Sequence, residues 1–276
     1  MIKELNVRVL CDDLAPFRSL ALAQHGVSYF IEIKYEDFER RLLFDTCSSY
    51  QVIKYNSSIM NIDLKKIDAI VISHGHYDHG GGLRDLLNEI NVPVFAHPTI
   101  FRENFYIPYL YIGIPKDHIL DLEKKNNFVF IREPLEIFPS VWTSGEVPRE
   151  NKFEVVENMY TIQDGKIIRD PMMDDTSLYI DLGESIFLVS GCSHAGIVNI
   201  KKHGEKIFGK RVSHIIGGLH LLNAKEERIN FTIENLADTE LYLGHCTGEN
   251  VINKFMENYG ERVKRIYSSF ELKVIP

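Results

Sequence analysis

The chain has 276 residues, of which 45% are hydrophobic and 25% are charged, and its formal net charge at pH 7 is -8. This is an ordinary globular composition, with enough chain to bury a large core. The acidic balance argues against a protein that binds nucleic acid or an anionic membrane through a basic face.

The N-terminal segment MIKELNVRVLCDD carries charges where a secretory signal needs an uninterrupted apolar stretch, and no apolar run is long enough to cross a bilayer. We therefore expect a soluble, cytoplasmic protein with neither a nucleic-acid nor a membrane partner, and we leave a homo-oligomer open. Cys11, Cys47, Cys192 and Cys246 are far apart and form no C-x-x-C pair, so we expect free thiols.

The first seventy residues look like strands, and the clearest of these segments are residues 6–11, 27–35 and 41–46. The apolar run 67–73 predicts a strand buried on both faces. Residues 82–90 show apolar side chains at helical spacing, and residues 92–97 return to strand. Residues 128–150 are strand-like but contain three prolines, and we assign no elements there.

Two hairpins are predicted next, over residues 159–170 around Asp164-Gly165 and over residues 176–191 around Gly183. Strands at 212–218 and 240–245 then alternate with helices at 195–208, 225–237 and 248–260. No linker or repeat divides the chain, so we expect one domain over residues 1–276. Its two halves each combine strands with strand-helix units, which predicts an α/β fold of the α+β kind with helices outside a central pair of sheets.

The stretch SHGHYDHGGGL follows the predicted buried strand and carries His74, His76, Asp78 and His79. Imidazole nitrogen and carboxylate oxygen both suit zinc, and imidazole also suits iron or nickel. These groups exceed what one tetrahedral ion takes from a single loop if the ion also keeps a catalytic water. The pattern therefore favours two ions, and the alternative is a solvated loop in which Asp78 caps the next helix.

Two later segments repeat this layout of a strand, a glycine turn and ligand-type side chains. IFLVSGCSHAG carries Cys192 and His194, and LYLGHCTG carries His245. Because each segment follows a predicted buried strand, we expect these side chains at the same sheet edge as the first motif.

These segments resemble the metallo-β-lactamase fold superfamily. SHGHYDHGGGL resembles the metal-binding signature of the superfamily. LLFDT resembles the strand whose aspartate, here Asp45, supports the signature loop, and LGHC resembles the segment with the histidine ligand near the C-terminus, here His245. More narrowly, SGCSHAG, GGLHLL and GHCTG together resemble the branch that contains 7,8-dihydropterin-6-methyl-4-(β-D-ribofuranosyl)aminobenzene-5'-phosphate synthase. The resemblance covers nearly the whole chain and implies a four-layer αββα fold.

The resemblance implies two divalent transition-metal ions, with zinc favoured over iron, manganese or nickel. It assigns one ion to His74, His76 and His194, and the other to Asp78, His79 and His245. Many hydrolases of the superfamily have a bridging aspartate where this chain has Cys192. That thiol is either a ligand, since a nearby dication lowers the pKa of a thiol, or a small buried residue, and both interpretations stay open.

Several other residues are candidates for the substrate site. We expect His220, which follows a strand and a glycine pair, to face the site and to hold a substrate phosphate or transfer a proton, and the alternative is a histidine packed in the core. Arg149 is the expected anion anchor, because a guanidinium binds phosphate through two parallel hydrogen bonds. His25 either lines the site or belongs to a turn, and Asp174 and Asp175 either close one edge of the site or cap a hairpin.

The first functional hypothesis is a metal-dependent hydrolase that acts on a small anionic molecule, such as a phosphorylated or ester-bearing compound. In it Asp78 is a ligand at the catalytic centre and His220 transfers a proton or contacts an oxyanion. The second hypothesis is the pterin transfer that the branch name implies. A di-iron oxygen or nitric-oxide reductase is disfavoured, because His76 stands where those sites have a glutamate, and an inactive binding module is disfavoured because the first motif is complete.

Overall fold

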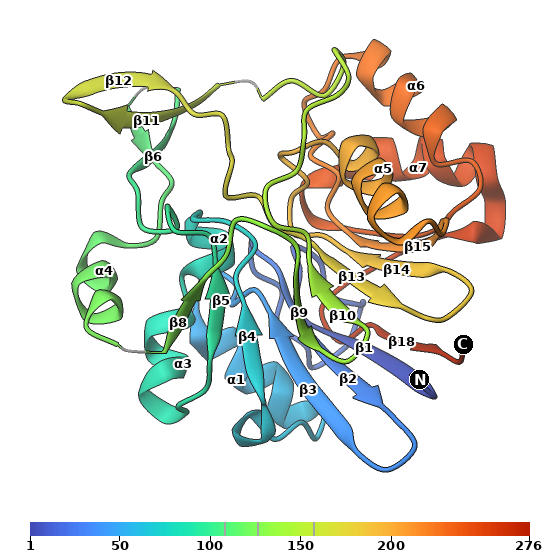
Figure 1. Ribbon diagram of the computed structural model, residues 1–276, viewed down its shortest axis with the longest axis horizontal. Helices are drawn as coiled ribbons and strands as arrows, with labels where there is room; N and C mark the ends of the chain where they lie inside the picture. Colours follow the sequence, from blue (N-terminus) through green and yellow to red (C-terminus); the bar gives the residue numbers. More distant parts are fainter. Residues whose placement is uncertain (108, 126, 157) are drawn as a thin grey trace.

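The computed structural model describes residues 1–107, 109–125, 127–156 and 158–276. Its first large sheet has the strand order β18 (Glu271–Val274), β1 (Glu4–Cys11), β2 (Ser28–Lys34), β3 (Glu39–Phe44), β4 (Ala69–Val71), β5 (Val94–Ala96) and β8 (Phe128–Phe130). The second has the order β17 (Val263–Arg265), β16 (Glu240–Leu243), β15 (Val212–Gly217), β14 (Ile186–Val189), β13 (Leu178–Asp181), β10 (Val141–Thr143) and β9 (Leu135–Phe138). A small sheet contains β12 (Lys166–Arg169), β11 (Met159–Gln163), β6 (Asn104–Tyr106) and β7 (Leu110–Tyr111), and lies apart from the other two (Figure 1).

Helices cover the outer faces of the two large sheets (Figure 1). The helices against the first sheet are α1 (Tyr50–Ile59), α3 (Leu83–Glu89) and α4 (Lys116–Glu123), and those against the second are α5 (Ile197–Phe208), α6 (Glu226–Asn235) and α7 (Glu249–Tyr259). The short elements are α2 (Tyr77–Gly80) and the 3₁₀ turns η1 (Leu64–Lys66), η2 (His245–Thr247) and η3 (Gly260–Arg262). This arrangement confirms the four-layer αββα fold.

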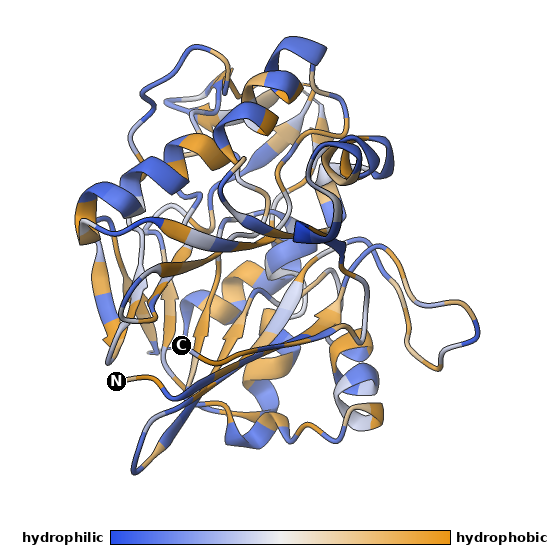
Figure 2. Cartoon of the chain, turned by 90° about the vertical axis from the view of Figure 1, so that its right-hand side faces the viewer, coloured by the Kyte–Doolittle hydropathy of each residue, from blue (hydrophilic) through white to orange (hydrophobic). Residues whose placement is uncertain are grey.

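The alternation of side chains along the strands explains the layers. In β4, Ala69 and Val71 pack between the two sheets, whereas Ile70 packs against α1 and α3. In β14, Phe187 packs between the sheets and Leu188 packs against the helices of the second half. Strands with two buried faces are apolar throughout, and in Figure 2 most strands are accordingly coloured as hydrophobic while the helices carry both colours.

The expectation that the first seventy residues form only strands is wrong, because α1 and η1 lie between β3 and β4. Tyr50 and Ile53, one helical turn apart, are buried against the first sheet, so packing holds this segment as a helix. The two predicted hairpins are confirmed as β11-β12 and β13-β14. Both turn residues of the first, Asp164 and Gly165, have positive φ angles of 50° and 71°, as a two-residue hairpin turn requires.

The expectation of free thiols fails for one pair, since Cys11 and Cys47 form a disulfide with Cα atoms 6.1 Å apart. The β1-β2-β3 meander brings the C-terminal ends of β1 and β3 to the same edge of the first sheet. The two cysteines are far apart in the sequence, so their spacing did not indicate this pairing. Cys192 and Cys246 are free. Within the described ranges, no helix has the length and apolar character needed to cross a membrane. The single domain over residues 1–276 stays a prediction.

Candidate metal centre

The predicted ligands come from loops at one edge of the two large sheets. The loop after β4 carries His74, the loop after β14 carries Cys192 and His194, and the turn after β16 carries His245. β14, β15 and β16 are parallel neighbours, so their carboxyl ends lie side by side. The fold therefore gathers side chains that are far apart in the sequence.

His74, His76 and His194 form the first ligand group, whose ligand atoms lie within 4.8 Å of one another. His74 Nε2 is 3.0 Å from His76 Nδ1, and the His194 ring centroid lies 4.7 Å from that of His74. All three side chains are buried. Among the described residues, His76 Nε2 and both ring nitrogens of His194 have no hydrogen-bond partner. Buried polar atoms are normally paired, so these nitrogens indicate a missing ligand.

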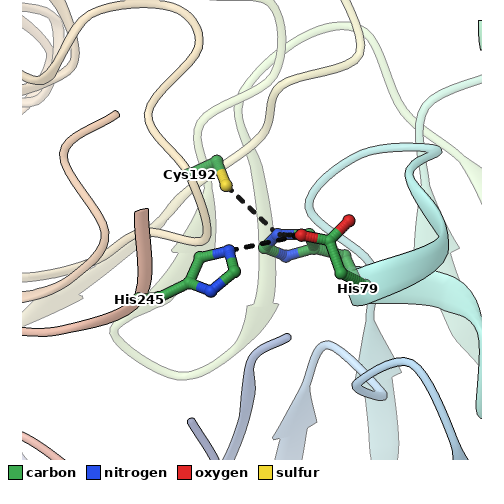
Figure 3. A group of neighbouring side chains, drawn as sticks. His79, Cys192 and His245 are labelled. Carbon is green, nitrogen blue, oxygen red and sulfur yellow. Dashed lines mark hydrogen bonds and ion pairs between the residues drawn. The ribbon is translucent and has the colours of Figure 1, made fainter. Parts of the chain in front are cut away.

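Asp78, His79, Cys192 and His245 form the second ligand group, again within 4.8 Å of one another. The Nε2 atoms of His79 and His245 lie 3.4 and 3.3 Å from Asp78 Oδ2. Cys192 Sγ lies 3.2 Å from His79 Nε2, and Figure 3 shows the three labelled side chains pointing toward one another. The thiol thus lies where a ligand would lie.

Asp45 supports the first motif from the end of β3. Its carboxylate accepts hydrogen bonds from the backbone N–H of Ser73 at 2.7 Å and from Ser73 Oγ at 2.7 Å. It also lies 2.6 Å from His79 Nδ1, which leaves His79 Nε2 facing Asp78. A carboxylate behind a metal-binding histidine fixes the tautomer and the orientation of the ring.

Asp13 has the same role for His245, and the sequence reasoning missed it. Asp13 Oδ1 lies 2.8 Å from His245 Nδ1, and Asp13 Oδ2 lies 2.9 Å from His25 Nδ1. The one available signal was the position of the Asp12-Asp13 pair directly after β1.

The protonation state of the first ligand group favours the binding of a cation. Burial lowers the pKa values of His74 and His194 well below the usual range of histidine, and it lowers the pKa of His76 to about 4. These imidazoles are therefore neutral at pH 7. Neutral imidazole is the form that binds metal. Burial would also lower the pKa of His79, but the Asp78 and Asp45 carboxylates outweigh it and raise that pKa to about 9.

Both groups fit divalent transition metals. The first offers three neutral imidazoles, and the second offers imidazole, carboxylate and thiol, which are the ligand types that zinc takes in proteins. A cation in the second group would release the proton that His79 otherwise holds, as is usual for metal binding.

The two groups border a cavity of about 280 Å³. His25 and His220 also line it, as does Arg228 of α6, which the sequence reasoning did not name. The other walls are largely apolar and include Tyr106, Ile112, Met159 and Leu222.

The structure does not bring Arg149 to this cavity. Its Nη2 donates hydrogen bonds to the backbone carbonyls of Pro171 and Met172, at 3.2 and 2.7 Å, so its role as anion anchor has no support from its position. Asp174 and Asp175 also lie outside the cavity lining. They accept hydrogen bonds from the backbone N–H groups of Gly75 and Ala195, so they brace the two ligand loops.

Similarity to known proteins identifies the family of the chain. The model of the metallo-beta-lactamase superfamily matches residues 23–194. Over 286 residues, the chain is 35% identical to 7,8-dihydropterin-6-methyl-4-(beta-D-ribofuranosyl)-aminobenzene-5'-phosphate synthase of Methanocaldococcus jannaschii, with 99% of this chain and 97% of the relative covered. It is also 33% identical over 255 residues to an uncharacterized protein of that organism, covering 91% of this chain and 94% of the relative.

Among solved structures, Tm1679, described as a metal-dependent hydrolase of the beta-lactamase superfamily, has a TM-score of 0.84. It is 26% identical and covers 99% of this chain and 100% of its own. Zn(2+)-bound PqqB from Methylobacterium extorquens has a TM-score of 0.57 at 14% identity, covering 97% and 99% of the two chains, and shares the fold. From its ligand loops, its αββα layers and these full-length similarities, we conclude that the chain belongs to the metallo-β-lactamase superfamily.

Proposed function

We propose that this chain is a metal-dependent hydrolase that acts on a small anionic molecule, in the simplest case a phosphorylated one. The observation that carries the proposal is that members of both ligand groups line one cavity of about 280 Å³, namely His76 and His194 of the first and Asp78, Cys192 and His245 of the second. A cavity of this size accommodates a small molecule rather than a polymer.

In this proposal, His74, His76 and His194 hold one divalent ion, and Asp78, His79 and His245 hold a second, with Cys192 as a further ligand. Zinc suits both sets, and iron, manganese and nickel are the alternatives. When bound, such ions would supply a water of lowered pKa and would stabilise negative charge on an ester or phosphoryl oxygen.

The chain's own residues complete the site. The His220 ring lies 4.3 Å from the His194 ring between centroids, and its buried Nδ1 has no hydrogen-bond partner within the described part of the chain. As long as no cation binds this nitrogen, His220 is placed to donate a hydrogen bond or a proton to the substrate. The hydrogen bond to Asp13 raises the pKa of His25, which favours its cationic form beside the cavity.

Arg228 supplies the fixed positive charge that Arg149 was expected to supply. The wall formed by Tyr106, Ile112 and Met159 favours a substrate that also has an apolar or aromatic part.

The test compares Arg228→Gln with Arg149→Gln on phosphorylated and neutral versions of one ester substrate. Arg228→Gln should raise KM for the phosphorylated version roughly 10- to 100-fold, since a hydrogen bond to a charged group contributes about 1.5–3 kcal/mol. Arg149→Gln should leave that KM unchanged, and both variants should keep their metals. If Arg228→Gln affected both substrates equally, or if the wild type preferred the neutral one, the anionic substrate would be refuted.

A second candidate is a pterin transferase, which the full-length relative at 35% identity favours. In that reaction a metal would polarise the leaving group on a pterin methyl carbon. A direct assay separates the two candidates. A hydrolase should cleave chromogenic phosphodiesters or lactones with added metal alone, whereas a transferase should turn over only with a dihydropterin diphosphate and an aminobenzene riboside.

A further inference from the structure

Two free thiols and a histidine meet beside the second ligand group. Cys192 follows β14, His220 follows β15 and Cys246 follows β16, so three adjacent strand ends each contribute one side chain. Their sulfur and imidazole ligand atoms lie within 4.8 Å of one another, and all three residues line the cavity. We propose that Cys192, His220 and Cys246 form a further, thiolate-rich site for a thiophilic divalent cation such as zinc, cobalt or cadmium.

The local backbone holds these donors in place. The backbone N–H of His220 donates to Cys246 Sγ at 3.3 Å, and Cys246 Sγ donates to the Cys192 carbonyl oxygen at 3.6 Å. A Cβ on Gly218 would come within 2.5 Å of Cys246 Sγ, so the glycine makes room for the thiol. His220 has a φ angle of 50°, which is uncommon for a residue with a side chain and aims its ring into the cavity.

An unused donor supports a ligand at this position. His220 Nδ1 is buried without a hydrogen-bond partner among the described residues, as are His76 Nε2 and both ring nitrogens of His194. Both cysteines are free, in contrast to the bonded pair Cys11 and Cys47. A buried imidazole nitrogen without a partner, in a ring that lies beside two free thiols, is costly unless a ligand binds there.

The donor chemistry selects the kind of ion. Two thiolates neutralise a dication, and sulfur ligands favour thiophilic metals over magnesium or calcium. Two thiolates and one imidazole also leave the fourth tetrahedral position open toward the cavity, where a small molecule can bind. Cys192 belongs to this cluster and to the second group, so one thiolate would serve both sites.

The first experiment loads metal-free protein with Co²⁺ and measures cobalt content and the near-ultraviolet thiolate-to-cobalt absorption. The wild type is compared with Cys246→Ala and His220→Ala, and with His214→Ala, which lies on β15 outside the cavity lining. The wild type should bind one more cobalt ion per chain than the Cys246→Ala variant binds. The absorption of Cys246→Ala should fall by about half, because one of two coordinating thiolates is gone.

His220→Ala should also lose this cobalt, and His214→Ala should match the wild type. Equal cobalt content and equal absorption in the wild type, Cys246→Ala and His220→Ala would overturn the proposal.

The second experiment uses the wild-type cysteines, so it does not depend on whether a cysteine variant folds. Iodoacetamide is added to the wild type with and without saturating Zn²⁺, and alkylation of Cys246 is followed by mass spectrometry. Zinc should slow alkylation about tenfold or more, because a coordinated thiolate is a poor nucleophile, and His220→Ala should lose this protection. An unchanged rate in the wild type would refute the site. Since the readouts are metal content and thiol reactivity, failure here leaves the hydrolase proposal intact.

Discussion

Carboxylates behind His79 and His245 determine which imidazole nitrogen of each ring faces Asp78. Asp45 lies 2.6 Å from His79 Nδ1 and Asp13 lies 2.8 Å from His245 Nδ1, so both Nε2 atoms face Asp78. Without such a partner, the imidazole can rotate and change its tautomer, and metal affinity falls.

We predict that Asp13→Ala weakens the second ion and spares the first. The affinity should fall roughly 10- to 100-fold, as is typical for loss of a carboxylate behind a metal ligand. Titration against a competing chelator measures it. Asp37→Ala is the control, because Asp37 is exposed on the turn between β2 and β3. Equal affinities of Asp13→Ala and Asp37→Ala would show that Asp13 does not position His245.

We predict that Cys192→Ser weakens the second ion more than the first, because serine is a far poorer ligand at neutral pH while its volume is similar. Metal content after dialysis at fixed free zinc measures the difference. If both ions were retained equally, the Cys192 thiol would be a packed side chain and not a metal ligand. Loss of activity with both ions present would point to proton chemistry instead.

A buried carboxylate lies at the start of α5, the helix that follows the loop carrying His194. The Glu154 carboxylate, from the segment before β11, accepts hydrogen bonds from the N–H groups of Val198 and Asn199 at 2.8 and 3.0 Å. Gly196 has a φ angle of 90°, and a Cβ there would come within 2.5 Å of Glu154. A buried side chain thus satisfies the first amides of the helix, which would otherwise lack partners.

We predict that Glu154→Ala lowers the free energy of unfolding of the metal-free protein by about 1.5–3 kcal/mol, the range for hydrogen bonds to a charged group. Urea denaturation measures this, with Glu150→Ala as the control, since Glu150 is exposed. A loss no larger than that of Glu150→Ala would mean that the carboxylate does not stabilise the helix start.

At the scale of the whole molecule, the ligand groups join the two halves of the sandwich. His74 and His76 follow a strand of the first sheet, whereas His194 follows a strand of the second. An ion held by all three would therefore link the halves in the folded state alone, because the unfolded chain does not hold these side chains together.

We predict that chelation lowers the melting temperature. An ion present at 1,000 times its dissociation constant stabilises the folded state by about 4 kcal/mol. Calorimetry with and without a chelator measures the shift, and His76→Ala/His245→Ala should show a smaller one. If the wild type and this double variant responded equally, the stabilising ions would lie elsewhere.

Features that depend on residues close together in the chain could be predicted from the sequence. Hairpin turns, buried strands and the His-x-His-x-Asp-His motif are local patterns, so the αββα layers and the histidines of both ligand groups were predictable. The helix α1 was missed because packing of Tyr50 and Ile53 against the first sheet determines it.

Contacts between side chains that are far apart in the sequence became visible in the folded structure alone. It pairs Asp13 with His245, joins Cys11 to Cys47, and brings Arg228 rather than Arg149 to the cavity. The spacing of these residues in the sequence does not predict their contacts, because the contacts depend on the order of strands in the sheets and on which strand ends share an edge. The cluster of Cys192, His220 and Cys246 has the same origin, since β14, β15 and β16 are neighbours in the sheet but not in the chain.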